Sequence, residues 1–200
     1  MKPQILYIHG GMTFKTREHY INYLKTRSIR IENLPHWNEE YMNDELNEYQ
    51  IIKPKMPCKE NSKYLEWKIH FERHTEFIED GVTLIGFSLG GIFLAKYLSE
   101  NLYPKKIKSV HLVAPPHEDS LTGEDLTEDW LLQNDLGKIE EQCKNVYLYF
   151  SLDDPIIPES QKNKYQEKLK KSTFMIYESA NGHFLQPEFE DLISNIKKHK

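Results

Sequence analysis

The chain has 200 residues, a formal net charge of −5 and two cysteines. This length suits one domain with a substantial hydrophobic core, so we expect a single domain over residues 1–200. Apolar residues make up 38% and charged residues 28% of the chain, which is polar without being disordered. The acidic balance argues against a nucleic-acid partner. Two cysteines without metal-ligand spacing argue against a secreted disulfide framework and against a metal site.

The first residues lead into only a short apolar run, which predicts a strand and not a signal peptide. No apolar stretch along the chain is long enough to cross a membrane. We therefore expect a cytoplasmic protein without a membrane partner. The sequence gives no indication of its oligomeric state.

Strand signals alternate with helix signals along the chain. Short apolar runs predict strands at 4–9, 49–53, 82–87, 109–114, 146–151 and 173–178. Patterns with helical spacing predict helices at 16–27, 62–79, 90–101, 159–171 and 187–198. This alternation predicts an α/β fold built from βαβ crossovers, with a mostly parallel sheet of about six strands covered by helices on both faces. Residues 31–48 fit the alternation poorly and are expected to form an irregular or helical excursion.

The most informative motif, G-x-S-x-G, spans residues 86–90 and stands between a strand signal and a helix signal. Glycines two positions before and two after Ser88 allow a sharp turn that leaves the serine hydroxyl exposed at the end of the strand. Ser88 is therefore the candidate nucleophile. The alternative interpretation is a glycine-rich turn that carries an inert serine.

An acid candidate and a base candidate follow later strands. Asp153 and Asp154 come after the strand over 146–151, and His183 comes after the strand over 173–178. A neighbouring imidazole activates a serine hydroxyl by taking its proton, and a buried carboxylate orients the imidazole. The order Ser, Asp, His is typical of an α/β-hydrolase triad.

All three candidates lie just past the carboxyl ends of predicted parallel strands, which form one edge of a sheet. We therefore expect them to meet at that edge. Asp119, which follows the strand before, is a third candidate for the acid.

The loop after the first strand reads His9-Gly10-Gly11-Met12, a candidate for half of an oxyanion hole. Holding a tetrahedral oxyanion takes two backbone N–H groups, one of them directly after the nucleophile, which here is Leu89. We expect Gly11 to supply the other, with Met12 as the second choice. The alternative is a plain turn that ends the strand. His9 precedes the serine, which does not fit the triad order, so we interpret it as a loop residue.

With these motifs the chain resembles an α/β-hydrolase. Within that superfamily it resembles the small single-domain serine hydrolases of the retinoblastoma-binding type and their bacterial relatives. The resemblance covers nearly the whole chain. It rests on the first strand from Gln4, Met56-Pro57 followed by Glu66-Trp67, the elbow over 86–90, Asp153-Asp154-Pro155, and Gly182-His183-Phe184 with Glu188-Phe189 behind it.

The resemblance implies that the acid is Asp154, which stands directly before a proline. It also implies that the long N-terminal antiparallel strands of larger hydrolases are absent. Two positions depart from the family pattern. The family's first loop usually reads Pro-Gly where this chain has His9-Gly10-Gly11, and its elbow usually has His where this chain has Phe87.

Residues 115–142 lie where α/β-hydrolases often insert a cap, so we expect a small cap or lid segment there. Trp130, Leu131 or Leu132 is expected to line an acyl pocket together with Met12 and Phe87. The alternative is that the tryptophan and leucines pack a short helix onto the sheet.

One further pair of side chains has the spacing of metal ligands. His70 and His74 have a spacing that can bind zinc, but a zincin motif needs Glu directly after the first histidine, and Phe71 stands there. They are interpreted as part of a helix surface, and no metal or cofactor is expected.

The sequence thus predicts a serine hydrolase that cleaves a small ester or thioester through an acyl-enzyme intermediate. The alternative is a non-catalytic or weakly catalytic binding protein on an α/β-hydrolase scaffold, because a fold does not imply a function. The complete Ser, Asp and His set favours the enzyme.

Overall fold

The computed structural model describes residues 2–29, 31–32, 34–132 and 135–199. Its centre is a six-stranded sheet with the order β2-β1-β3-β4-β5-β6, in which every pair of neighbouring strands is parallel. The strands are β1 (Gln4–Ile8), β2 (Gln50–Ile52), β3 (Val82–Phe87), β4 (Ile107–Val113), β5 (Val146–Ser151) and β6 (Thr173–Tyr177). This confirms the expected α/β fold, and the sheet has no antiparallel strand within the described part of the chain.

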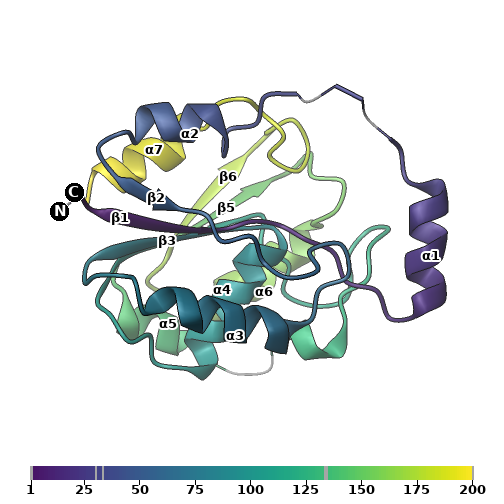
Figure 1. The fold of residues 1–200 in the computed structure, drawn as a ribbon, viewed down its shortest axis with the longest axis horizontal. Helices are drawn as coiled ribbons and strands as arrows, with labels where there is room; N and C mark the ends of the chain where they lie inside the picture. Colours follow the sequence, from purple (N-terminus) through teal and green to yellow (C-terminus); the bar gives the residue numbers. More distant parts are fainter. Residues whose placement is uncertain (1, 30, 33, 133–134, 200) are drawn as a thin grey trace.

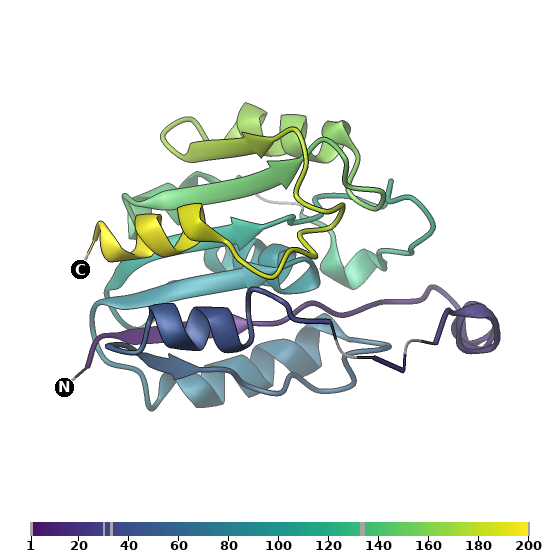
Figure 2. The same cartoon turned by 90° about the horizontal axis from the view of Figure 1, so that it is seen from above.

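Helices cover both faces of the sheet (Figures 1 and 2). The helices are α1 (Arg17–Thr26), α2 (Glu40–Glu45), α3 (Tyr64–Thr75), α4 (Leu89–Glu100), α5 (Gly137–Gln142), α6 (Glu159–Lys168) and α7 (Glu190–Lys197), with a 3₁₀ turn η1 (Glu128–Trp130). Helices α2 and α7 lie on one face, and α3 to α6 lie on the other. Helix α1 stands off the body beyond the carboxyl ends of the strands and has no buried residue.

The core is centred on β3 and α4. Five of the six residues of β3 are buried, and in α4 every residue from Leu89 to Ser99 is buried. Helix α4 packs on β3 and β4 and is itself covered by α5 and η1. Aromatic rings of α3 fill the space beside it, with Phe71 and Trp67 5.1 and 5.8 Å from the ring of Phe93. A helix packed on all sides is nearly uniformly apolar, which is the pattern that α4 shows.

The excursion over 31–48 contains the short helix α2 and is anchored by Trp37, which is fully buried. The Trp37 indole N–H donates to the carbonyl of Phe184 at 3.0 Å, and the Trp37 backbone N–H donates to Gln186 O at 3.1 Å. Its ring also packs edge-on against Phe87 at 5.8 Å. The excursion therefore clamps the loop that follows β6.

The segment over 115–142 is tied into the body. Thr13 forms an isolated bridge with Asp125, and Trp130 is fully buried between α3 and α4. Residues 133 and 134, which belong to the expected cap, lie outside the described residues. The cap itself stays a prediction.

The turn from β3 into α4 is unusually close to its neighbours. A Cβ atom added to Gly86 would lie 2.3 Å from the carbonyl oxygen of Gly90. One added to Gly90 would lie 2.2 Å from the carbonyl oxygen of Ile8 in β1. Both contacts involve backbone atoms, which cannot move aside as a flexible side chain can. The two outer glycines of the motif are therefore required by the approach of α4 to the sheet.

We expect Gly90→Ala to lower the free energy of unfolding by about 3 kcal/mol or more, because the added methyl group overlaps the β1 backbone. Gly137→Ala is the matched control. A Cβ there meets only the flexible side chain of Asp135, at 3.3 Å, at the start of α5. Urea denaturation followed by circular dichroism measures both variants. Equal stability of the two would contradict the close approach.

Candidate active site

Ser88 sits on the turn between β3 and α4 with φ 53° and ψ −119°. Residues other than glycine rarely adopt a positive φ, because this backbone conformation is strained. Such strain persists only where the surrounding structure holds the residue in place. Here the Ser88 N–H donates to Val113 O at 2.8 Å, and the Ser88 carbonyl accepts from Gly91 N at 2.8 Å. The turn is thus fixed from both sides, and Ser88 lines an open groove at the carboxyl edge of the sheet.

His183 and Asp154 form a buried hydrogen-bonded pair. The His183 Nδ1 atom lies 2.7 Å from Asp154 Oδ2, and the two side chains are 10% and 1% exposed. The other oxygen of Asp154 accepts from the N–H groups of Ile156 at 2.9 Å and Ile157 at 3.0 Å. Because an ionised carboxylate only accepts, Nδ1 carries the proton and Nε2 is left as the free lone pair.

The Nε2 atom of His183 is buried and has no hydrogen-bond partner among the described residues. His183 lines the same groove as Ser88, and its ring packs at 5.2 Å from that of Phe87. Contacts between a base and its nucleophile are often loose until substrate binds. The arrangement therefore offers an unused acceptor in the groove that the serine lines.

Asp153 faces a different set of groups. Its carboxylate accepts from the hydroxyls of Ser151 and Ser179 and from the N–H groups of Ala180 at 3.1 Å and Gly182 at 3.0 Å. These hydrogen bonds, the two hydroxyls first, hold the pKa of Asp153 well below its usual range. Asp153 fixes the loop that carries His183, while Asp154 contacts the imidazole.

The third acid candidate is also engaged elsewhere. The carboxylate of Asp119 accepts from Leu126 N at 2.9 Å and pairs with Lys15. The geometry therefore favours Asp154 as the acid.

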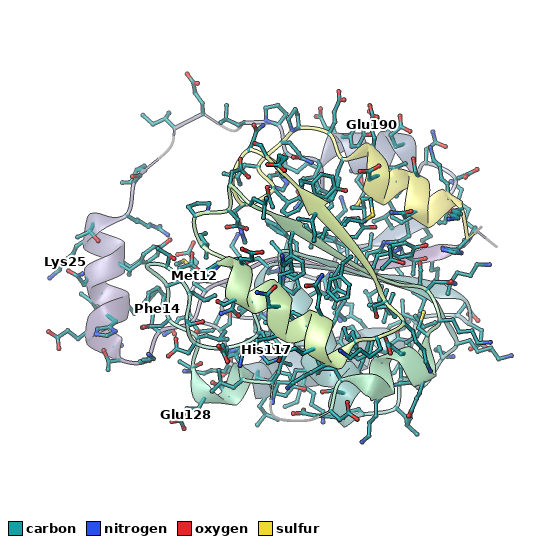
Figure 3. The ribbon with its side chains drawn as sticks, turned by 180° about the vertical axis from the view of Figure 1, so that it is seen from behind. Met12, Phe14, Lys25, His117, Glu128 and Glu190 are labelled. Carbon is teal, nitrogen blue, oxygen red and sulfur yellow. The ribbon has the colours of Figure 1, made fainter. Side chains whose placement is uncertain are left out.

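The groove has a volume of about 530 Å³ and brings several predicted residues together. Gly11, Met12, Phe87, Ser88 and His183 all line it. Met12 and Phe14 lie between α1 and the body (Figure 3).

Two backbone N–H groups remain candidates for an oxyanion hole. Leu89 is the first residue of α4, where a helix N–H has no intrahelical acceptor and the helix dipole favours negative charge. In the first loop, the Met12 N–H donates to Lys59 O at 2.8 Å, so it is already used. A Cβ built on Gly10 would lie 3.3 Å from the Cβ of Ser88, so this loop passes directly beside the serine. Gly11 therefore stays our choice for the second donor.

His9 holds the same loop in place. Its Nδ1 lies 2.6 Å from Gly10 O, and its Nε2 accepts from Met56 N at 3.0 Å. Burial is the largest effect on its pKa and lowers it. A neutral histidine with both nitrogens in use supports the interpretation as a loop residue.

The pocket prediction was wrong for Trp130 and Leu131, which do not line the groove. Trp130 is fully buried, with its ring 5.1 Å from that of Trp67 and 5.8 Å from that of Tyr64. The Leu131 carbonyl accepts from Lys96 Nζ at 3.0 Å. The apolar side chains of this stretch pack the short turn η1 onto α3 and α4, because the core between these helices is where a large ring buries most area.

The sequence missed several residues that line the groove: His36, Asn38, Glu39, Lys59 and Glu124. His36 packs 5.6 Å from the ring of Phe87, and burial lowers its pKa. These residues come from loops that carry no motif. Except for Lys59, which lies in the loop between β2 and α3, their only sequence signal is that they belong to the two segments, 31–48 and 115–142, that break the strand–helix alternation.

His117, in contrast, lies away from the groove. Its ring packs edge-on at 5.2 Å from Tyr165 of α6, and burial lowers its pKa to about 4. Figure 3 shows it beside α6. It is a packed residue of the region between β4 and α6.

A six-stranded parallel sheet with a strained serine on the β3–α4 turn and a histidine–aspartate pair on the same groove defines an α/β-hydrolase. The chain belongs to the serine hydrolase family. The family model described as serine hydrolase matches residues 31–189. No curated protein matches the chain.

Solved structures share this fold at low sequence identity. The ydeN gene product from B. subtilis is 19% identical, with a TM-score of 0.77 over 98% of each chain. A meta-cleavage product hydrolase from Pseudomonas fluorescens is 12% identical, with a TM-score of 0.66 over 99% of this chain and 92% of that one. The esterase Pf2001 from Pyrococcus furiosus is 16% identical, with a TM-score of 0.60 over 99% of this chain and 80% of that one. These likenesses show the fold.

Among the described residues, no helix has the length and apolar character needed to cross a membrane. The same part of the chain contains no group of three or more His, Cys, Asp or Glu side chains arranged to hold a metal ion.

We expect Asp153→Asn to destabilise the protein in a pH-dependent way. The pKa of Asp153 is lowered in the folded state, so its carboxylate stabilises the fold above about pH 4, the ordinary pKa of an aspartate. That contribution decreases as pH falls from this value and is lost only when pH passes through the lowered pKa of the folded state. The urea midpoint of the variant should therefore lie below wild type at pH 7, and the gap should narrow progressively as pH falls below about 4.

Asp44→Asn is the control, because Asp44 is exposed on α2 and its carboxylate has no hydrogen bond among the described residues. A gap between Asp153→Asn and wild type that stayed constant with pH would show that the carboxylate charge is not what holds the loop.

Proposed function

We propose that the protein cleaves a small ester or thioester through an acyl-enzyme intermediate. Ser88 Oγ attacks the carbonyl carbon while His183 Nε2 takes the hydroxyl proton. The N–H groups of Leu89 and Gly11 donate to the oxyanion that forms. His183 then gives the proton to the departing alcohol or thiol. A water activated by the same Nε2 attacks the acyl-enzyme, and the acid leaves with Ser88 regenerated.

The observation that carries this proposal is the state of the His183 ring. Its Nδ1 is held by a nearly fully buried Asp154, while its Nε2 is buried, has no partner among the described residues, and belongs to a residue of the groove that Ser88 lines. A buried polar atom without a partner is costly, and such atoms concentrate at functional sites. A ring held only for packing has no need of a buried carboxylate on Nδ1.

The strain at Ser88 supports the same assignment. A structural turn at this position would be satisfied by glycine, which adopts positive φ without cost. The serine is instead held there by the hydrogen bonds of β4 and α4. Asp154 acts by orienting His183 and by stabilising its positive form, and it does not itself take the proton.

Ser88→Ala should lower kcat by about 10³-fold or more and abolish labelling by a fluorophosphonate probe, because no other group replaces the nucleophile. Hydrolysis of p-nitrophenyl butyrate and probe labelling read by mass spectrometry measure the two effects. The thermal unfolding profile serves as the control for folding. A variant that kept more than roughly a tenth of wild-type activity would contradict Ser88 as the nucleophile, and wild-type protein that neither hydrolysed the ester nor took the label would favour a binding protein on this fold.

Asp154→Asn should keep the fold but cost about 10⁴-fold in kcat, because the amide allows His183 to adopt the wrong tautomer. Asp153→Asn is the comparison at the neighbouring position. It should cost far less in kcat when both are assayed at a pH and temperature where they are folded. The reverse ranking of the two losses would assign the acid to Asp153.

A further inference from the structure

The carboxylate of Glu124 lies in the groove with Ser88 and His183. Its side chain is partly buried, and among the described residues it accepts no hydrogen bond and forms no ion pair. Burial raises its pKa. The charge of Asp154 adds to this effect, and the charge of His183 opposes it. A partly desolvated carboxylate thus stands beside the reacting groups with its hydrogen-bonding capacity unused.

The position of Glu124 is fixed from both sides. On one side, Thr122 N donates to Ile156 O at 3.1 Å, and Ile156 belongs to the turn that Asp154 holds. On the other side, Asp125 O accepts from the Thr13 hydroxyl at 2.8 Å, and its carboxylate accepts from Lys15 N at 3.1 Å. The residues on both sides of Glu124 are therefore hydrogen-bonded to other loops, and these contacts hold its carboxylate in the groove.

The other charges of the groove are arranged differently. Glu60 is paired with Arg27 at 2.8 Å. Glu39 and Lys59 line the groove but are exposed to water, where a charge is already solvated. Glu124 is the acidic side chain of the groove that is both partly shielded from water and unpaired within the described part of the chain. A positive charge that enters the groove gains most at this position.

We propose that Glu124 is a specificity-determining residue that binds a positively charged group, such as an ammonium, on the acyl or the leaving-group side of the substrate. The inference rests on the proposed ester or thioester hydrolysis and names the substrate class of that same site. The bound cation would supply the partner that the carboxylate lacks, so a charged substrate is favoured over a neutral one of the same shape. Because the contact is made beside the reacting carbonyl, it also orients the substrate for attack by Ser88.

The test uses pairs of substrates that differ only in charge. One pair is butyrylthiocholine and its neutral isostere with carbon in place of the quaternary nitrogen, which probes the leaving group. The other is the p-nitrophenyl ester of γ-trimethylammoniobutyrate and its carbon isostere, which probes the acyl side. Wild type should show a kcat/KM preference of roughly tenfold for the charged member of at least one pair, the size expected of a charge-assisted contact in a partly exposed site.

Glu124→Gln keeps the shape of the side chain and removes its charge, so it should reduce the preference to near one while leaving the neutral substrates within about twofold of wild type. Glu128→Gln is the matched control. Glu128 is exposed on η1, away from the groove (Figure 3). Its substitution by glutamine removes one negative charge, as the substitution of Glu124 does. It should keep the full preference, which excludes a long-range effect of net charge.

Two results would overturn the inference. One is that wild type shows no preference for the charged member of either pair. The other is that Glu124→Gln lowers charged and neutral substrates equally and shifts the acid limb of the kcat/KM profile with pH, which would make Glu124 an electrostatic partner of His183 instead. Neither result would contradict the proposed ester or thioester hydrolysis. That function is tested separately, by fluorophosphonate labelling of Ser88 in wild type and in Glu124→Gln.

Discussion

The close contact between the first turn of α4 and the backbone of β1 is the constraint on which the site depends. There is no room for a Cβ at Gly90 beside Ile8 O, so the helix begins almost on top of the sheet. The chain can make this turn only by placing Ser88 in a strained conformation. Since α4 is buried along nearly its whole length, the turn cannot relax by moving the helix. The strain is thus held by the hydrophobic core.

On the other side of the groove, two adjacent aspartates make different contacts that together position His183. Asp154 contacts the His183 ring, while Asp153 gathers the hydroxyl and N–H groups of the loop that carries that ring. Trp37 holds the far end of the loop through the Phe184 carbonyl. Such outer contacts fix an imidazole as firmly as its direct partner does, because a ring on a free loop would sample many orientations. The histidine is therefore positioned by three segments that are distant in sequence.

The charge balance of the groove distinguishes this site from a plain apolar acyl pocket. Acidic side chains from the excursion over 31–48, from the loop before α3 and from the loop over 115–127 meet around Ser88. Of the residues expected to form an acyl pocket, Trp130 is used in the core, while Met12 and Phe87 line the groove. Under the proposed function, these acidic side chains give substrate selection a Coulomb and hydrogen-bond component in addition to apolar contact.

The strands, their parallel arrangement and the identity of the triad candidates could all be predicted from the amino-acid sequence. These are read from local signals: apolar runs of strand length, glycines spaced for a tight turn, and polar residues placed just after strands. Such local patterns specify structure through interactions within a few residues, so the tertiary fold does not change what they predict.

The side chains that surround the serine, in contrast, could not be predicted without the three-dimensional fold. Trp130 reads the same in sequence whether it lines a pocket or fills a core, because burial in either place satisfies an apolar ring. The sequence favours Asp154 over Asp153 only through the family resemblance. In the structure, the loop after β6 offers its N–H groups to Asp153 and its imidazole to Asp154. Glu124 carries no local signal at all. The role that we propose for it rests on long-range contacts that place a loop carboxylate, without a counter-ion among the described residues, in the groove of Ser88.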